Sequence, residues 1–162
     1  EKEEGLRGGH ENKLDLIQVY SRLLYNVISK VEASGFFSAD IYLQSLPYFF
    51  SFLCSKGVSP EDISVDDTFG FIEDRYLRGN KDTTIMIYLR SIDECYFIYA
   101  NEGLPVPEGE TIEAFVTSTL DSLEAGGVVR GSNPNFGYEI KISQQMPIEE
   151  MADIHKKFHP RS

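Results

Sequence analysis

The chain has 162 residues, of which 41% are hydrophobic, so it is long enough to form one domain with a sizeable core. Its 15 basic and 26 acidic side chains give a formal net charge of −11, which disfavours the extensive phosphate contacts of strongly basic nucleic-acid binders. No apolar run approaches the roughly 20 residues that a membrane-spanning helix needs, so we expect no membrane partner.

Hydrophobic periodicity predicts three helices in the first half of the chain. The first spans residues 14–34, and the second spans residues 39–56. Pro47 lies inside the second pattern, so we expect it to kink this helix or to split it. Ser64 is the expected N-cap of the third helix, which has acidic residues in its first turn and arginines in its last, as the helix dipole favours.

The fourth predicted helix, over residues 81–103, is the most informative segment. Its apolar residues recur at steps of three and four and therefore share one face: Ile85, Leu89, Ile92, Tyr96 and Tyr99. A fifth helix is predicted over residues 111–125. Alternating residues then predict two strands, 128–130 and 138–143, around a turn rich in Asn and Gly, before a last helix that begins at Pro147.

These elements predict a mainly α protein, a bundle of four to five helices with a small C-terminal β-hairpin. We expect a disordered lead-in over residues 1–12 and a helical domain over residues 13–104. Residues 105–146 would form a linker helix plus the hairpin. Residues 147–162 would be the start of a truncated following domain.

The sequence contains no catalytic constellation, phosphate-binding loop or metal-ligand motif. His155 and His159 are four residues apart, but no third ligand accompanies them, which favours surface histidines. Cys54 and Cys95 lie within apolar helical patterns, which favours buried free thiols in a cytoplasmic protein. We therefore expect no metal, no cofactor and no catalysis by this chain.

Several short motifs occur in a recognisable order. A helix rich in Tyr, Leu and Phe over residues 39–56 precedes an Asp-Ile-Ser turn at 62–64 and a Phe-Ile pair at 71–72. The helix over 81–103 then carries Thr-Ile-x-x-Tyr-Leu-Arg and ends on Ala-x-Glu-Gly. This order resembles the SAM-like core-binding domain of tyrosine recombinases, the phage-type integrases. Lys81 stands where that family favours a Ser or Thr cap.

The resemblance implies that the chain positions double-stranded DNA for site-specific recombination, beside other recombinase protomers. It places the catalytic residues of the family in a separate following domain, so this chain would hold DNA and not cut it. The candidate DNA contacts are Lys81, Thr83, Thr84, Tyr88 and Arg90 on the fourth helix, with Lys56, Arg75 and Arg78 extending a basic strip.

Thr83 and Thr84, near a helix N-terminus, would offer hydroxyl and N–H groups to a phosphate, and Arg90 would bind a phosphate or a guanine edge. A structural interpretation competes with this one. In this interpretation the threonines only start the helix, and Arg90 pairs with Glu94. The other basic side chains are solvated and lie at helix ends, where they complement the helix dipole.

Two other functions stay open. Residues 110–143, taken as helix, strand, loop and strand, are similar to the recognition helix and wing of winged-helix proteins, which suggests a transcriptional regulator. Residues 61–110 carry twelve acidic and four basic side chains, a balance that favours a non-catalytic helical module with a basic protein partner.

Overall fold

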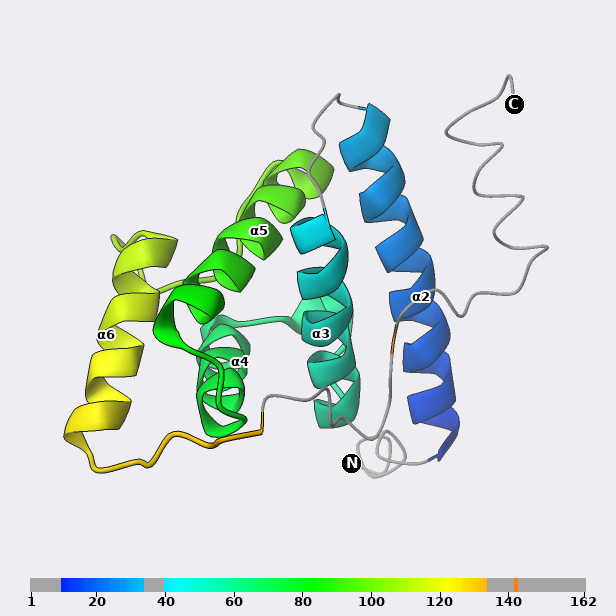
Figure 1. Cartoon of the computed structure of the whole chain (residues 1–162). Helices are drawn as coiled ribbons and strands as arrows, with labels where there is room; N and C mark the ends of the chain where they lie inside the picture. Colours follow the sequence, from blue (N-terminus) through cyan, green and yellow to red (C-terminus); the bar gives the residue numbers. More distant parts are fainter. Residues whose placement is uncertain (1–9, 34–39, 134–141, 143–162) are drawn as a thin grey trace, which may run out of the picture.

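Five α-helices and one short 3₁₀ turn make up the part of the chain that the computed structural model describes, which is residues 10–33, 40–133 and 142. The helices pack side by side, with α2 and α6 at opposite edges of the bundle (Figure 1). The mainly helical fold predicted from the sequence is therefore confirmed. None of the described helices combines the length and the apolar character needed to cross a membrane. The elements are α2 (His10–Ala33), α3 (Asp40–Lys56), η1 (Pro60–Asp62), α4 (Val65–Leu77), α5 (Asp82–Ala100) and α6 (Ile112–Ala125).

Helix α5 is the central element, because it contacts each of the other four described α-helices. The aliphatic residues of its predicted apolar face, Ile85, Leu89 and Ile92, are each 0% exposed, whereas Tyr96 and Tyr99 on the same face are partly buried. Burial of each aliphatic side chain of this kind contributes about 1.5–3 kcal/mol. The inner face of α5 is thus committed to the core, which leaves its outer face and its two ends for function.

Aromatic side chains fill the space around α3. The ring centroids of Phe49 and Phe71 are 5.1 Å apart in an edge-on arrangement, and those of Tyr20 and Phe50 are 5.2 Å apart. Such pairs stabilise a core beyond their buried area. Helix α3 runs as one helix through Pro47, so the predicted split does not occur. We attribute this continuity to the aromatic packing, which offsets the cost of about 3 kcal/mol for a proline inside a helix.

The predicted C-terminal β-hairpin is not supported. Residues 128–130 form a loop instead of a strand. Among the described residues, this segment makes hydrogen bonds to α4 and not to a partner strand. The Tyr76 hydroxyl donates to the Val128 carbonyl at 2.8 Å, and the Gly131 N–H donates to the Tyr76 carbonyl at 3.2 Å. The second strand lies outside the described residues apart from Ile142, whose N–H donates to the Ser51 hydroxyl at 2.6 Å. The winged-helix alternative also required a strand over residues 128–130, so its first wing strand is absent as well.

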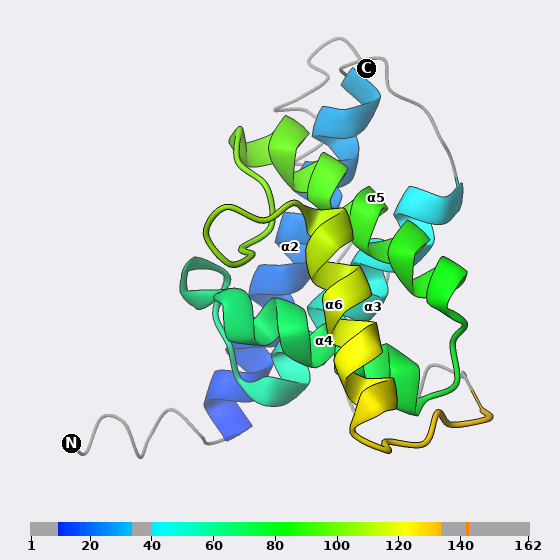
Figure 2. The same cartoon turned by 90° about the vertical axis from the view of Figure 1, so that its left-hand side faces the viewer.

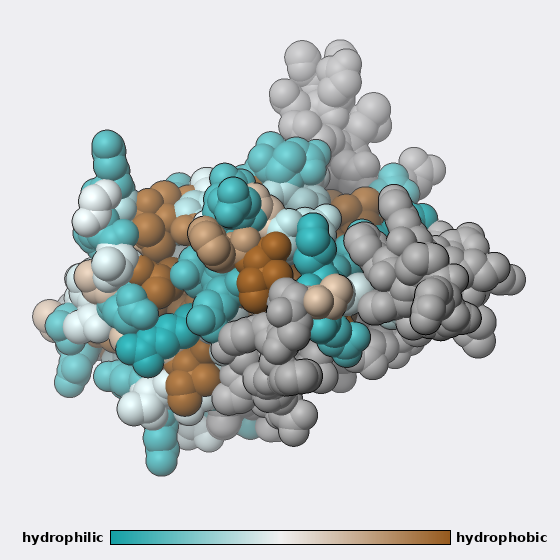
Figure 3. All heavy atoms as spheres, turned by 90° about the horizontal axis from the view of Figure 1, so that it is seen from above, coloured by the Kyte–Doolittle hydropathy of each residue, from teal (hydrophilic) through white to brown (hydrophobic). Residues whose placement is uncertain are grey.

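Exposed hydrophobic side chains are spread over the described surface. Phe97 is 58% exposed and Val129 81% exposed, and the others come from α2, α4 and α5. Seen from above, brown clusters alternate with teal residues (Figure 3). Scattered exposure of this kind is normal for a protein surface. The hollows and the charged clusters are therefore the surface features that bear on function.

Candidate nucleic-acid interface

Basic side chains gather at the corner where α4 gives way to α5. Arg75 and Arg78 lie at the end of α4, and Lys81 directly precedes α5. Arg130 reaches the same corner from the segment after α6, where it donates to the Asn80 carbonyl. Four of the fifteen Lys and Arg residues of this acidic chain are therefore close to residues 78–82.

Arg130 ties this corner together. Its Nη2 lies 2.6 Å from Oδ1 of Asp82, and its guanidinium carbon lies 4.4 Å from the ring centroid of Tyr76. The ion pair neutralises the acidic residue nearest the start of α5. Arg130 is not among the DNA contacts that the integrase resemblance implies. Only the winged-helix alternative, in which residues 128–130 are a strand of the wing, gives Arg130 a contact with DNA. No local pattern marks a loop residue that binds a helix end 50 residues earlier.

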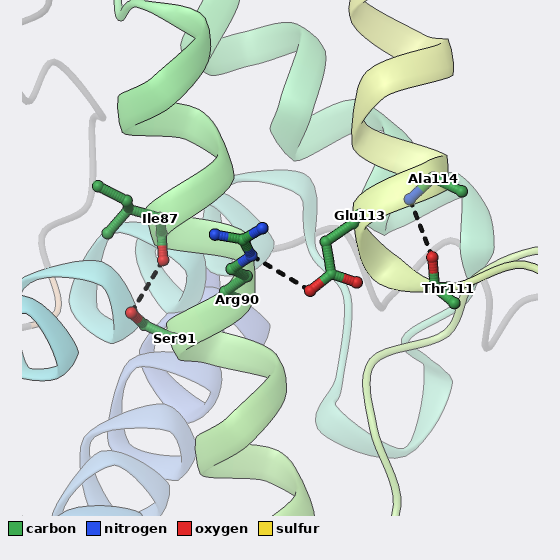
Figure 4. Close-up of polar contacts among 6 residues, drawn as sticks. All are labelled: Ile87, Arg90, Ser91, Thr111, Glu113 and Ala114. Carbon is green, nitrogen blue, oxygen red and sulfur yellow. Dashed lines mark hydrogen bonds and ion pairs between the residues drawn. The ribbon is translucent and has the colours of Figure 1, made fainter.

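The start of α5 differs from the starts of α4 and α6. Asp67 accepts from the Ser64 N–H at 2.8 Å in α4, and Thr111 accepts from the Ala114 N–H at 3.0 Å in α6 (Figure 4). In α5 the N-cap is Lys81, whose side chain makes no capping hydrogen bond. The first-turn N–H groups of a helix have no intrahelical acceptor, so this end of α5 is suited to an anion.

The predicted contact residues fall into three environments. Lys81 and Thr83 are exposed at the start of α5, with Thr84 half-buried beside them. Arg78 is partly exposed and forms an ion pair with Asp74 at 3.0 Å. Lys56 is exposed at the end of α3, with its ammonium 5.5 Å from the Phe52 ring.

Arg75 and Tyr88 have internal roles. Arg75 is 0% exposed, its Nε donates to Asn80 Oδ1 at 2.7 Å, and its guanidinium carbon lies 4.8 Å from the Tyr48 ring centroid. The ring of Tyr88 lies edge-on to the ring of Tyr48, with the two ring centroids 5.6 Å apart. Burial raises the pKa of the Tyr88 hydroxyl, with a further rise from Tyr48 and an opposing effect of Arg75. Arg75 is too deeply buried to touch a duplex, so its part is to position Asn80.

The remaining predicted contact, Arg90, bridges two helices. Its Nε lies 3.1 Å from Oε2 of Glu113 on α6 (Figure 4). Both side chains are about half exposed. The sequence favours Glu94 as the partner of Arg90, because that residue is four positions further along the helix. No local pattern predicts the pairing with Glu113, which lies 23 residues from Arg90 on another helix.

A groove of about 470 Å³ runs between α5 and α6 beside this ion pair. Met86, Ile87 and Leu120 contribute its apolar lining, and Asp82 and Asp121 add acidic groups. Thr83 and Arg90 also line it, so the groove brings together two of the predicted contact residues. Because its lining is largely apolar, the groove is better suited to bind a protein side chain than a phosphate.

The described residues contain no group of three His, Cys, Asp or Glu side chains arranged to hold a metal ion. Comparison of the chain with protein-family models, curated proteins and solved structures finds no match.

Proposed function

We propose that this chain is a DNA-binding, core-binding segment of a site-specific tyrosine recombinase, which positions double-stranded DNA without carrying out the chemistry. The observation that carries the proposal is the start of α5, where an N-terminus without a side-chain cap meets Lys81, Arg78 and Arg130. The order of helices and motifs that suggested the family leads to this same helix.

In the proposed complex, the first turn of α5 faces a phosphate. Its N–H groups and the Thr83 hydroxyl donate to the phosphate oxygens, and Lys81 adds a charge. Arg78 and Arg130 lie within the same corner but are each engaged by an aspartate, so they contribute only part of their charge. We therefore expect weak duplex binding that falls steeply as the salt concentration rises.

Fluorescence anisotropy with a labelled duplex at two salt concentrations tests the proposal. Lys81→Glu should lower the affinity about tenfold, since the change replaces an attractive charge by a repulsive one. Lys30→Glu is the matched control, because Lys30 lies over the ring of Tyr99, which is about 27 Å along α5 from Lys81. An equal loss in both variants, or no binding of the parent chain at low salt, would contradict a DNA site at this corner.

The groove between α5 and α6 favours a second candidate, an acidic module that binds a basic amphipathic helix of another protein. Ile87 is 41% exposed in the groove, and Asp82 and Asp121 flank it with negative charge. A helix with Leu and Lys on one face would fit such a surface. A synthetic peptide of that type should bind the parent chain and lose affinity in Asp121→Lys, while duplex binding should not weaken in that variant.

A further inference from the structure

The exposed side chains of α5 form one continuous stripe. Their positions recur at alternating steps of four and three residues, which is the spacing of residues that pack one helix against another. Between residues 83 and 97 no other residue of α5 is exposed. Figure 2 shows α5 running obliquely across the bundle, with α6 packed beside it. We call this stripe the α5 seam, and its members are Thr83, Ile87, Arg90, Glu94, Phe97 and Asn101.

The chemistry of the α5 seam is balanced about its centre. Arg90 and Glu94, of opposite charge, occupy the two central positions. Ile87 comes three residues before them and Phe97 three residues after them, and these two side chains are 41% and 58% exposed. A stripe of this kind is complementary to itself when a second copy runs in the opposite direction. Each Arg90 then faces a Glu94, and each Ile87 faces a Phe97.

The charges also select the direction of the second helix. In a parallel pair equivalent positions meet, so Arg90 would face Arg90 and Glu94 would face Glu94. Like charges in contact repel each other. In an antiparallel pair both central contacts join opposite charges. The pattern therefore favours the antiparallel arrangement.

The groove between α5 and α6 lies on the same flank of the α5 seam as Phe97. Met86 and Arg90 line this groove, and Phe97 follows them by about three and two full helical turns. A two-fold axis between antiparallel helices keeps this flank of one copy on the same side as the equivalent flank of the other. Phe97 of one copy therefore meets the groove of the other, where Met86, Ile87 and Leu120 offer an apolar lining. The groove and the exposed aromatic side chain are the two halves of a self-complementary contact.

The pairing of Arg90 within the chain leaves room for this contact. Only its Nε is bonded to Glu113, at 3.1 Å, and its two terminal nitrogens make no hydrogen bond within the part of the chain that the structure describes (Figure 4). A guanidinium group carries five N–H donors. An ion pair with Glu94 of a second copy therefore adds to the pair with Glu113 and does not have to replace it.

We propose that the α5 seam and the groove beside it form a two-fold, antiparallel contact between two copies of this chain. A second copy is the occupant because the chain itself supplies the complementary charge and the aromatic side chain that the groove accepts. The contact does not depend on the proposed DNA binding. The seam is only about 27 Å long, and each copy carries a net charge of −11, so we expect a weak dimer with a dissociation constant on the order of 100 μM.

Sedimentation velocity of the full chain, from about 10 μM to about 1 mM and at about 0.15 M salt, measures this association. Arg90→Glu and Glu94→Arg should each raise the dissociation constant at least about tenfold, because both ion pairs of the symmetric dimer become repulsive. An equimolar mixture of these two variants should recover the association, since each contact across the two-fold axis again joins opposite charges. Glu124→Arg makes the same charge change as Glu94→Arg at an exposed position of α6 outside the seam, and it should change the dissociation constant by less than about twofold.

A second pair of variants tests the apolar part of the contact. Phe97→Ser should raise the dissociation constant at least about tenfold, because the symmetric dimer loses two aromatic side chains. Phe69→Ser is the matched control, since Phe69 is 38% exposed on α4 and lies outside the seam. It should leave the dissociation constant unchanged.

A parent chain that remains monomeric at about 1 mM would overturn the proposal. A mixture of the two charge variants that associates no better than either variant alone would also overturn it. A dimer that is weakened equally by Phe97→Ser and by Phe69→Ser would show that another surface holds the two copies. Circular dichroism checks the helical fold of each variant, and if a charge variant loses this fold, the comparison of the two Phe variants decides.

Discussion

Replacement of Arg130 by methionine should loosen the corner on which the proposed DNA interface depends. The change removes the ion pair with Asp82 at 2.6 Å, the hydrogen bond to the Asn80 carbonyl and the contact with the Tyr76 ring at 4.4 Å. Methionine keeps a long apolar side chain, so most of the packing along the arginine stem remains. The measured loss therefore reports chiefly on the guanidinium group.

The three contacts of the guanidinium can be weighed separately. The side chains of Arg130 and Asp82 are 32% and 58% exposed, so their ion pair contributes at most about 1 kcal/mol. A hydrogen bond from a charged donor contributes about 1.5 kcal/mol or more. The cation–π contact adds about 0.5–1 kcal/mol. Because the contacts share one group they are not additive, and we expect a total loss of about 2–3 kcal/mol.

Urea unfolding of the full chain, followed by circular dichroism, measures this loss. Lys81→Met is the matched control, because it removes a neighbouring exposed charge and should change the free energy of unfolding by less than about 0.5 kcal/mol. A double-mutant cycle with Asp82→Asn isolates the ion pair. A loss below about 1 kcal/mol for Arg130→Met, or one equal to the control, would refute the role assigned to Arg130.

Three further changes test the interior. Leu89→Ala should lower the free energy of unfolding by about 2–5 kcal/mol, since Leu89 is fully buried, and urea unfolding would show this. Arg75→Lys should cost about 1–3 kcal/mol in the same assay, because lysine lacks the Nε that bonds Asn80 and the plane that packs on Tyr48. The third concerns pH. Burial raises the pKa of the Cys95 thiol from 9.0 to about 12, so the folded state holds its proton while the unfolded state releases it. Stability should therefore be unaffected by this group below pH 9 and should fall as the pH rises from 9 towards 12, and this fall should be smaller in Cys95→Ala.

The helices were predictable from the sequence because their signals are local. The apolar face of α5 repeats at helical steps, and the acidic residues after Ser64 act on backbone groups within one turn. Each of these signals involves residues that are at most four positions apart. The central place of α5 follows from the same pattern, since Ile85, Leu89 and Ile92 of the predicted stripe are fully buried and its two tyrosines pack against the core.

The contacts that shape the candidate site were not predictable in this way. Arg130 binds residues about 50 positions earlier, and Arg90 pairs with Glu113 on another helix. Arg75 has the sequence context of a solvated helix end, yet it is fully buried between aromatic rings. Only the packing of α4, α5 and α6 brings these groups together. Contacts between residues so far apart leave no repeating pattern in a single sequence from which they could be predicted.

A single change, Asp82→Asn, separates the two candidate functions by the direction of its effects. Asp82 holds Arg130 and also lines the groove between α5 and α6. If the corner binds DNA, loss of this carboxylate releases the Arg130 charge for a phosphate and removes a repulsive acid, so duplex affinity should rise while stability falls slightly. If the groove binds a basic helix, the same loss removes an attractive charge, so peptide affinity should fall. Duplex affinity that falls in parallel with stability would mean that Asp82 serves only to order the corner, and it would count against Arg130 as a DNA contact.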